Sequence, residues 1–453
     1  MKKYCFVVLA LLTIVATSFT TKDKGSSDKV TKSQYENPKY VNLRQSGESV
    51  RYGDYNFHNI KPKGSANTLL SLKSVPPLPL YFMDYMAEVD WDQLTAIKYG
   101  LYDTLTITKR IDSLLYYCPP VKPNEEDEAR NKGGACSGFV CFNSNNELLF
   151  CRNYDGNTNP LVVVFNKNVK SGEHKSVMMT DLKMAQMFSG LGEEYGKDSC
   201  LTIPRKPLDA ILRQPMAIMD GMNDAGLCIA AYQLPDFEEK KLTGNDAPDG
   251  AILRPYGINQ DEKGKAHITS AFLHEMILAK CATVQDVVNL FNSYNYTTTV
   301  PKLNIHWYVA DAQNNWATLE FWKGPDGKDS LYVMNEKYRA DAAYLSRTPV
   351  PYEYRCIENF YCNMEAASAY NSSSWQYTYS TKARALNMMS HYSPVMEEDE
   401  ALRCLQYGSY GIEAPGYVTD WSCVYNPKNR TVKFTMRNNA EIIYMIDLNK
   451  DLE

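Results

Sequence analysis

The chain has 453 residues, of which 44% are hydrophobic and 22% are charged. Its length allows one large domain or several smaller ones, and its composition excludes wholesale disorder, a collagen-like repeat and a coiled coil. Lys and Arg number 48 against 53 Asp and Glu, which gives a net charge of −5. Since no run of four basic residues occurs, we expect no nucleic-acid partner.

The first 18 residues have the features of a secretory signal peptide. Lys2 and Lys3 precede an apolar stretch from Tyr4 to Ala16, and Ala16-Thr17-Ser18 offers small residues to a signal peptidase. A membrane anchor would need about 20 apolar residues, more than this stretch provides, and no later segment is both long and apolar enough. We therefore expect an exported protein, periplasmic or extracellular, without a membrane span.

Twelve cysteines are present, and eleven remain once Cys5 leaves with the signal peptide, since 12 − 1 = 11. An odd number in an exported protein leaves at least one thiol without a disulfide partner. The spacings contain no C-x-x-C motif and the six His are scattered along the chain. We therefore expect no zinc site, no other metal and no cofactor.

Residues 19–135 are predicted to form a polar leader followed by a helical pro-segment. Residues 19–75 are rich in Ser, Lys, Gly and Asn without sustained periodicity, which indicates an exposed stretch. From Tyr85 to Tyr117, apolar residues recur at spacings of three and four, which favours one or two amphipathic helices. The charged segment 121–134 indicates a solvated linker.

After Gly134 the pattern becomes that of a β-hairpin. Ala135 to Phe142 is β-prone, residues 143–146 form a turn, and Glu147 to Asn153 gives the second strand. Further patterns indicate strands at 227–232, 305–310, 317–321, 422–425, 431–437 and 441–446, and helices at 267–280, 283–294 and 381–392. Hairpins in runs, with helices grouped elsewhere, favour an α+β fold over residues 136–453.

Four segments, in chain order, resemble the choloylglycine hydrolase family of linear amide C–N hydrolases. They are ACSGFVCFNSNNELLFCRNYD from Ala135, DGMNDAGL from Asp220, IHWYVAD from Ile305, and WSCVY from Trp421 onward to Leu448. The resemblance implies an αββα four-layer sandwich, the fold of N-terminal-nucleophile (Ntn) hydrolases, over residues 136–453. It also implies cleavage between Ala135 and Cys136, which would make Cys136 the first residue of the catalytic chain.

The implied chemistry explains why a cysteine should begin the chain. A terminal α-amine, whose ordinary pKa is about 7.7–8, can take the thiol proton and return it, whereas an amide nitrogen cannot. Arg152 returns along the hairpin beside Cys136, where a cation favours the thiolate, and Asp155 can accept hydrogen bonds from the ammonium. Cys136, Arg152 and Asp155 are the predicted catalytic centre; without that context, Arg152 and Asp155 would indicate only a surface ion pair.

Other residues at family positions depart from the family pattern. Gln233 replaces an oxyanion-hole Asn, although its amide and its backbone N–H are still donors. Arg347 replaces a second Asn, unless Asn335 is the counterpart. Arg384 matches a late catalytic Arg, with Lys382 as a competing register and an exposed helix-end charge as the alternative interpretation.

Two side chains are predicted to contact the substrate. Tyr154 would supply aromatic surface beside the nucleophile, or it would simply fill the core of the sandwich. Arg347 would pair with a carboxylate or sulfonate of the leaving group, or it would exclude a bulky steroid in favour of a linear chain.

The predicted reaction is hydrolysis of a small amphipathic N-acyl amide with a hydrophobic acyl group, through an acyl-thioester on Cys136. N-acylethanolamines, N-acyl amino acids and bile-acid conjugates are the candidate substrates, with bile salt hydrolase or penicillin V acylase proper as the alternative activities. A serine hydrolase is disfavoured because G-x-S-x-G is absent. The alternative outside the enzymes is a secreted, Tyr-rich binding protein without catalytic activity, since the chain contains 33 Tyr. The leader 19–135 is similar in layout to that of acid ceramidase-like relatives, whose leader stays as a companion chain, and this resemblance implies the same here. Separately, we expect a homo-oligomer.

Overall fold

The structure is a computed structural model, in which residues Lys39–Glu453 form one compact unit. It describes residues 37–50, 63–87, 89–101, 103, 106, 136–156, 160–181, 218–234, 257–299, 305–323, 329–335, 356–359, 388, 391–409, 418–437, 439 and 441–453. The signal peptide, Ala135, Arg347, Lys382 and Arg384 lie outside the described residues.

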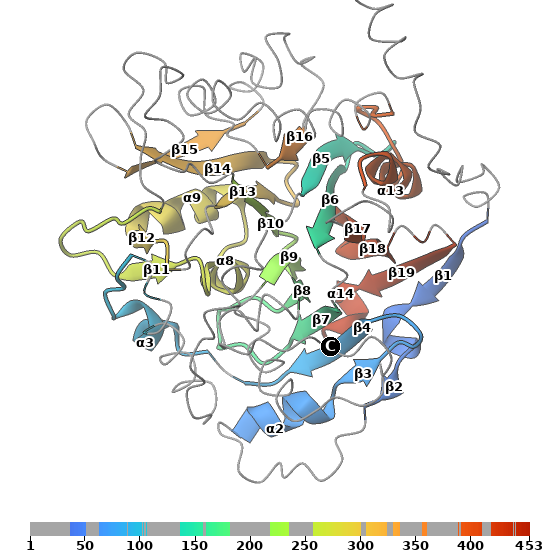
Figure 1. Ribbon diagram of the computed structural model, residues 1–453, viewed down its shortest axis with the longest axis horizontal. Coiled ribbons are helices and arrows are strands. Elements are labelled where there is room, and N and C mark those ends of the chain that lie inside the picture. The colour runs from blue at the N-terminus through green and yellow to red at the C-terminus, as the bar shows by residue number, and fades with distance from the viewer. Residues whose placement is uncertain are drawn as a thin grey trace, which may run out of the picture. The chain divides into compact units, whose positions relative to one another are not determined.

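The predicted hairpin is part of a seven-stranded sheet, called sheet A, with strand order β1-β19-β18-β17-β6-β5-β16 (Figure 1). Its strands are β1 (Lys39–Asn42), β5 (Ser137–Phe142), β6 (Leu148–Gly156), β16 (Cys356–Glu358), β17 (Val418–Asn426), β18 (Thr431–Met436) and β19 (Ile442–Asp447). β5 and β6 pair antiparallel with Gly138 opposite Arg152. This register carries Arg152 back toward the start of β5, where Cys136 lies.

A second sheet of ten strands, called sheet B, has the order β15-β14-β13-β10-β9-β8-β7-β4-β3-β2. Its strands are β2 (Glu48–Ser49), β3 (Lys73–Ser74), β4 (Leu80–Tyr85), β7 (Leu161–Asn166), β8 (Ser176–Asp181), β9 (Ile218–Asn223), β10 (Cys228–Gln233), β13 (Ile305–Ala310), β14 (Trp316–Lys323) and β15 (Asp329–Met334). A separate pair consists of β11 (His267–Thr269) and β12 (Asn295–Thr297).

One turn of sheet B needs a glycine. In the β9–β10 turn, Gly226 has φ +85°, and an added Cβ would collide with the Pro427 carbonyl of sheet A's β17–β18 turn. Only glycine suits this turn.

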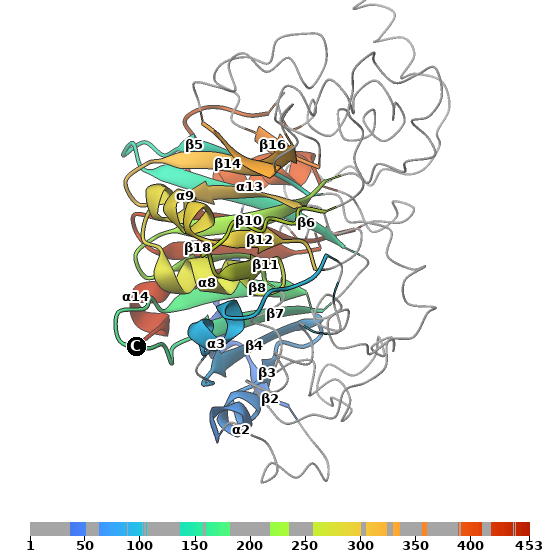
Figure 2. The ribbon, with the colours of Figure 1, turned by 90° about the vertical axis from the view of Figure 1, so that its left-hand side faces the viewer.

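Apolar side chains pack in three layers around the two sheets. Between the sheets, Val140 and Phe150 of sheet A meet Val163 and Met179 of sheet B. The outer face of sheet B is covered by α3 (Trp91–Thr95), α8 (Leu273–Lys280) and α9 (Val284–Ser293), and the outer face of sheet A by α13 (Glu398–Tyr407). The order helix, sheet, sheet, helix confirms the predicted αββα sandwich (Figure 1), and Figure 2 shows α8 and α9 in front of the strands that they cover. Shorter helices are η2 (Leu43–Gln45), α2 (Lys63–Leu70) and α14 (Leu448–Asp451).

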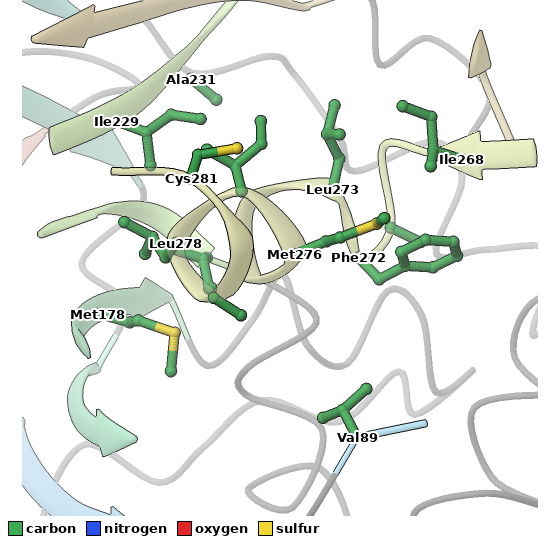
Figure 3. Close-up of a cluster of buried hydrophobic side chains, with 14 of the residues drawn as sticks. Val89, Met178, Ile229, Ala231, Ile268, Phe272, Leu273, Met276, Leu278 and Cys281 are labelled. Atoms are coloured by element: carbon green, nitrogen blue, oxygen red, sulfur yellow. The ribbon is translucent and has the colours of Figure 1, made fainter. Parts of the chain in front are cut away.

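Helix α8 is buried on nearly every side, and its buried residues include the polar side chains of His274 and Glu275. Leu273, Met276 and Leu278 are buried, and Figure 3 shows α8 among side chains of sheet B such as Ile229 and Met178. Among the described helices, none has the length and apolarity that crossing a lipid bilayer requires.

The segment before Cys136 differs from the exposed leader that its composition predicts. β1 pairs in parallel with β19 of sheet A, and β4 pairs in parallel with β7 of sheet B. Apart from Asp84, the residues of β4 (LYFMDY) are aromatic or apolar and buried, as suits an interior strand. The predicted helix from Tyr85 is also wrong at its start, because Tyr85 ends β4 and α3 begins only at Trp91. The helix predicted at 381–392 lies almost entirely outside the described residues.

Candidate active site

Cys136 lies immediately before β5, and its side chain is 4% exposed in the layer between the two sheets. A thiol in this layer is shielded from bulk water, so its ionisation depends on the few polar groups around it. Other described cysteines are also buried thiols, among them Cys141, Cys151, Cys228, Cys281, Cys404 and Cys423. In the described part of the chain, no three His, Cys, Asp or Glu residues are grouped so as to hold a metal ion.

Arg152 is fully buried and directs each edge of its guanidinium to a different group. Nη2 donates to Sγ of Cys136 at 3.5 Å, and Nη1 donates to the Ala231 carbonyl at 2.7 Å. Nε lies 2.8 Å from Oδ2 of Asp220, and the ring of Tyr232 lies 4.6 Å from Cζ. Burial alone lowers the pKa of Arg152, but Cys136 and Asp220 outweigh it and raise that pKa above its ordinary value. A permanent cation therefore faces the sulfur.

Asp155 lies on the opposite face of β6 from Arg152, because successive side chains of a strand alternate. Its buried carboxylate accepts a hydrogen bond from the hydroxyl of Thr419. Ser137 pairs with Asn153. Continuing that antiparallel register by one residue puts Cys136 across from Tyr154, with Asp155 one residue further along β6. The hairpin thus brings Asp155 to the end of the sheet that holds Cys136.

Tyr154 shares a face of β6 with Arg152 and is held on two sides. Its ring stacks on Trp421 with centroids 4.0 Å apart, and its hydroxyl donates to Oδ2 of Asp181 at 2.7 Å. Burial first, and then Asp181 and Cys136, raise the pKa of Tyr154 well above its ordinary value. Tyr154 is therefore a neutral, rigid wall beside the nucleophile.

Asn359 is the site residue that the sequence did not reveal. Its Oδ1 accepts a hydrogen bond from the backbone N–H of Cys136, and its Nδ2 donates to the Gln233 carbonyl at 2.6 Å. β16 pairs with β5 so that Glu358 lies opposite Ser137, and the next residue reaches Cys136. Asn335, by contrast, is exposed at the end of β15. An Asn directly after a short β-prone run was the available signal.

Gln233, the last residue of β10, reaches the site through its backbone carbonyl, which accepts from Asn359. Its side chain is partly exposed. Arg347, which was predicted as the alternative to Asn335, and Arg384 lie outside the described residues, so their roles stay predictions.

An αββα sandwich of this layer order is the fold of the Ntn hydrolases, and this chain has that fold. Residues 136–343 of the chain match the family described as linear amide C-N hydrolases, choloylglycine hydrolase family. The fourth motif, from Trp421 to Leu448, lies beyond the matched segment.

Solved structures with similar folds include three amide hydrolases. A variant of the conjugated bile acid hydrolase from Clostridium perfringens has 12% sequence identity, with 70% of this chain and 93% of that chain covered and a TM-score of 0.42. Penicillin V acylase from Agrobacterium tumefaciens has 18% identity, with 70% and 88% covered and a TM-score of 0.42. The Caenorhabditis elegans ortholog of N-acylethanolamine-hydrolyzing acid amidase has 11% identity, with 65% and 93% covered and a TM-score of 0.33. Among curated proteins, no sequence matches this chain.

Proposed function

We propose that this protein hydrolyses N-acyl amides with a hydrophobic acyl group, using Cys136 as the nucleophile. The observation that carries the proposal is the contact between Arg152 and the buried sulfur of Cys136, at the residue where the family match begins. A fixed cation at a thiol favours the thiolate, which is the reacting species.

The reaction needs a free α-amine on Cys136, so the proposal includes cleavage between Ala135 and Cys136. The amine takes the thiol proton, and the thiolate attacks the amide carbon to form a tetrahedral oxyanion. When that intermediate collapses, the C–N bond breaks and the ammonium returns its proton to the leaving amine. Water then attacks the thioester, releasing the carboxylic acid and the Cys136 thiol. Oδ1 of Asn359, which accepts from the nitrogen of Cys136, is placed to orient the amine.

The surroundings of the sulfur support an apolar acyl group. Tyr154 and Trp421 form a stacked aromatic pair in the same layer as Cys136. Ligand sites of this kind are mostly apolar with a few fixed polar groups. N-acylethanolamines, N-acyl amino acids and bile-acid conjugates all fit this description, and penicillin V-like amides are the alternative. Export by the signal peptide remains part of the proposal.

The substrate class is tested with oleoylethanolamide, an oleoyl amino acid, taurocholate, glycocholate and penicillin V. Wild-type protein should hydrolyse at least one amide, and Cys136→Ser should lose nearly all turnover because a hydroxyl is a poorer nucleophile at neutral pH. The matched control is Cys281→Ala, which removes a buried thiol after α8 and should keep the wild-type kcat. No hydrolysis of any of the five by correctly cut wild-type protein would contradict the proposed class.

A variant of Arg347 tests whether this residue recognises an anionic leaving group. If it pairs with a carboxylate, Arg347→Ala should lower kcat/KM for a glycine conjugate and leave the ethanolamine conjugate unchanged. Equal losses on both conjugates would remove Arg347 from leaving-group recognition.

A further inference from the structure

Asp220, the third residue of β9, was known from the sequence only as the start of the DGMN motif. It is fully buried, and its Oδ2 lies 2.8 Å from Nε of Arg152. A guanidinium is a rigid plane with donors on fixed edges. The ion pair with Asp220 at Nε and the hydrogen bond from Nη1 to the Ala231 carbonyl hold the guanidinium on two sides, and Nη2 faces Cys136.

The partners of Asp220 come from the other sheet. Three alternate residues of β17 turn their side chains toward it: Trp421 Nε1 donates to Oδ2 at 3.1 Å, Cys423 Sγ donates to Oδ1 at 3.4 Å, and the Tyr425 hydroxyl donates to Oδ1. Residues two apart on a strand share a face, so one surface of β17 supplies all three donors. The anchor of Arg152 therefore spans the layer between the sheets.

The partners of Asp220 also determine its charge. Burial raises the pKa of Asp220, whereas Arg152 and the three donors lower it. A proton on Oδ2 would face Arg152 and the Trp421 indole, and neither group can accept a hydrogen bond. The donor set therefore matches the carboxylate, and Asp220 is an anion paired with Arg152.

We propose that Asp220 is a positioning residue for Cys136: it holds Arg152 in place and neutralises part of its charge, so that the thiolate forms without being over-stabilised. The inference rests on the proposed function, because it takes Cys136 as the nucleophile. An over-stabilised thiolate is a weaker nucleophile. It would also exchange its proton poorly with an α-amine whose ordinary pKa is about 7.7–8.

Other titratable groups face this centre from the neighbouring strands and stay in place in the variants below. They are Arg152 and Tyr154 on β6, Tyr232 on β10, Cys423 and Asp420 on β17, and Asp181 on β8. The test therefore compares variants of Asp220 and its donor Tyr425 in this constant surrounding.

The experiment measures the rate of Cys136 alkylation by iodoacetamide against pH, by peptide mass spectrometry on the cut protein, together with kcat per alkylatable Cys136. Asp220→Asn removes the negative charge, so the alkylation midpoint should move to lower pH by about one unit. Its kcat should nevertheless fall by roughly tenfold, a part of what positioned proton transfer contributes. Tyr425→Phe removes a donor that offsets the charge of Asp220, so its midpoint should move slightly to higher pH.

The alkylation midpoint is expected to shift in opposite directions in Asp220→Asn and Tyr425→Phe. A residue that only supported the fold would not produce this pair of shifts. Asp311→Asn, which removes a buried carboxylate from the β13–β14 turn, is the control and should leave the midpoint unchanged. An upward or unchanged midpoint in Asp220→Asn would overturn the proposal. If that variant does not fold, an unchanged midpoint in Tyr425→Phe would overturn it instead. Alkylation needs no turnover, so this result stands apart from whether any amide is hydrolysed.

Discussion

His274, a fully buried imidazole in α8, illustrates how single residues set the pH range of the fold. Its Nδ1 lies 2.6 Å from the Ile218 carbonyl, and the Trp307 indole donates to its Nε2 at 2.8 Å. Since an indole can only donate, Nε2 accepts and the proton sits on Nδ1. Burial accordingly lowers the pKa of His274 to about 4.

Because folded His274 is neutral, we expect the free energy of unfolding to fall in acid. The ordinary pKa of an unfolded His is about 6.5, so below that pH the unfolded chain binds a proton that the folded chain refuses. The contribution is fully present above pH 6.5 and is lost as the pH falls toward 4, about 3 kcal/mol in all. Urea unfolding at pH 7 and pH 4 should show a smaller difference for His274→Gln than for wild type. His391→Gln, at an exposed site, is the control; a wild-type difference in His274→Gln would contradict the assignment.

Gly138 is predicted to tolerate no side chain. A Cβ there would collide with the Tyr232 hydroxyl and lie 2.5 Å from the Cys151 carbonyl. Overpacking of this kind costs roughly 1–3 kcal/mol, and here it would also push Tyr232 against Arg152. Gly138→Ala should therefore lower both the free energy of unfolding and kcat. Gly100→Ala, where the nearest atom is 3.5 Å away, should change neither.

At the scale of elements, α9 depends on its first turn. The Thr283 hydroxyl accepts from the backbone of Asp286, whose carboxylate accepts from the backbone of Thr283 in return. Losing such a cap costs about 1 kcal/mol. Thr283→Ala should lower the unfolding free energy by that amount, whereas Thr283→Ser, which keeps the hydroxyl, should retain most of it. Equal losses in chemical denaturation would show that the methyl group matters instead.

Elements with a local pattern were predictable, and those defined by distant partners were not. The hairpin β5–β6, strand β13 and strand β18 are β-prone runs that a short window contains, and the structure confirms them. β4 looks apolar without period, and only its pairing with β7 makes it a strand. The same reason hid Asn359: Arg152 reaches Cys136 through one tight hairpin, whereas Asn359 does so through β16, 223 residues along the chain.

At the scale of the whole molecule, cleavage before Cys136 is predicted not to release the leader. β1 lies on the edge of sheet A, and β2, β3 and β4 complete one end of sheet B. The two pieces should elute together in native size-exclusion chromatography and separate in denaturant. Cys136→Ala is the single-chain control if Cys136 itself cuts the chain. Loss of the leader from cut, active protein under native conditions would contradict this prediction.

The parallel pairing of β4 with β7 also changes the molecularity of folding. In the uncut chain, β4 and β7 are tethered, and closing the loop between them is an intramolecular event. After the cut, the same pairing requires two molecules to meet. An uncut protein should therefore refold at a rate independent of its concentration, whereas the cut enzyme, once unfolded, depends on encounter between its halves. Cleavage would thus act as a one-way step: the chain assembles while it is whole, and the active form persists by not coming apart.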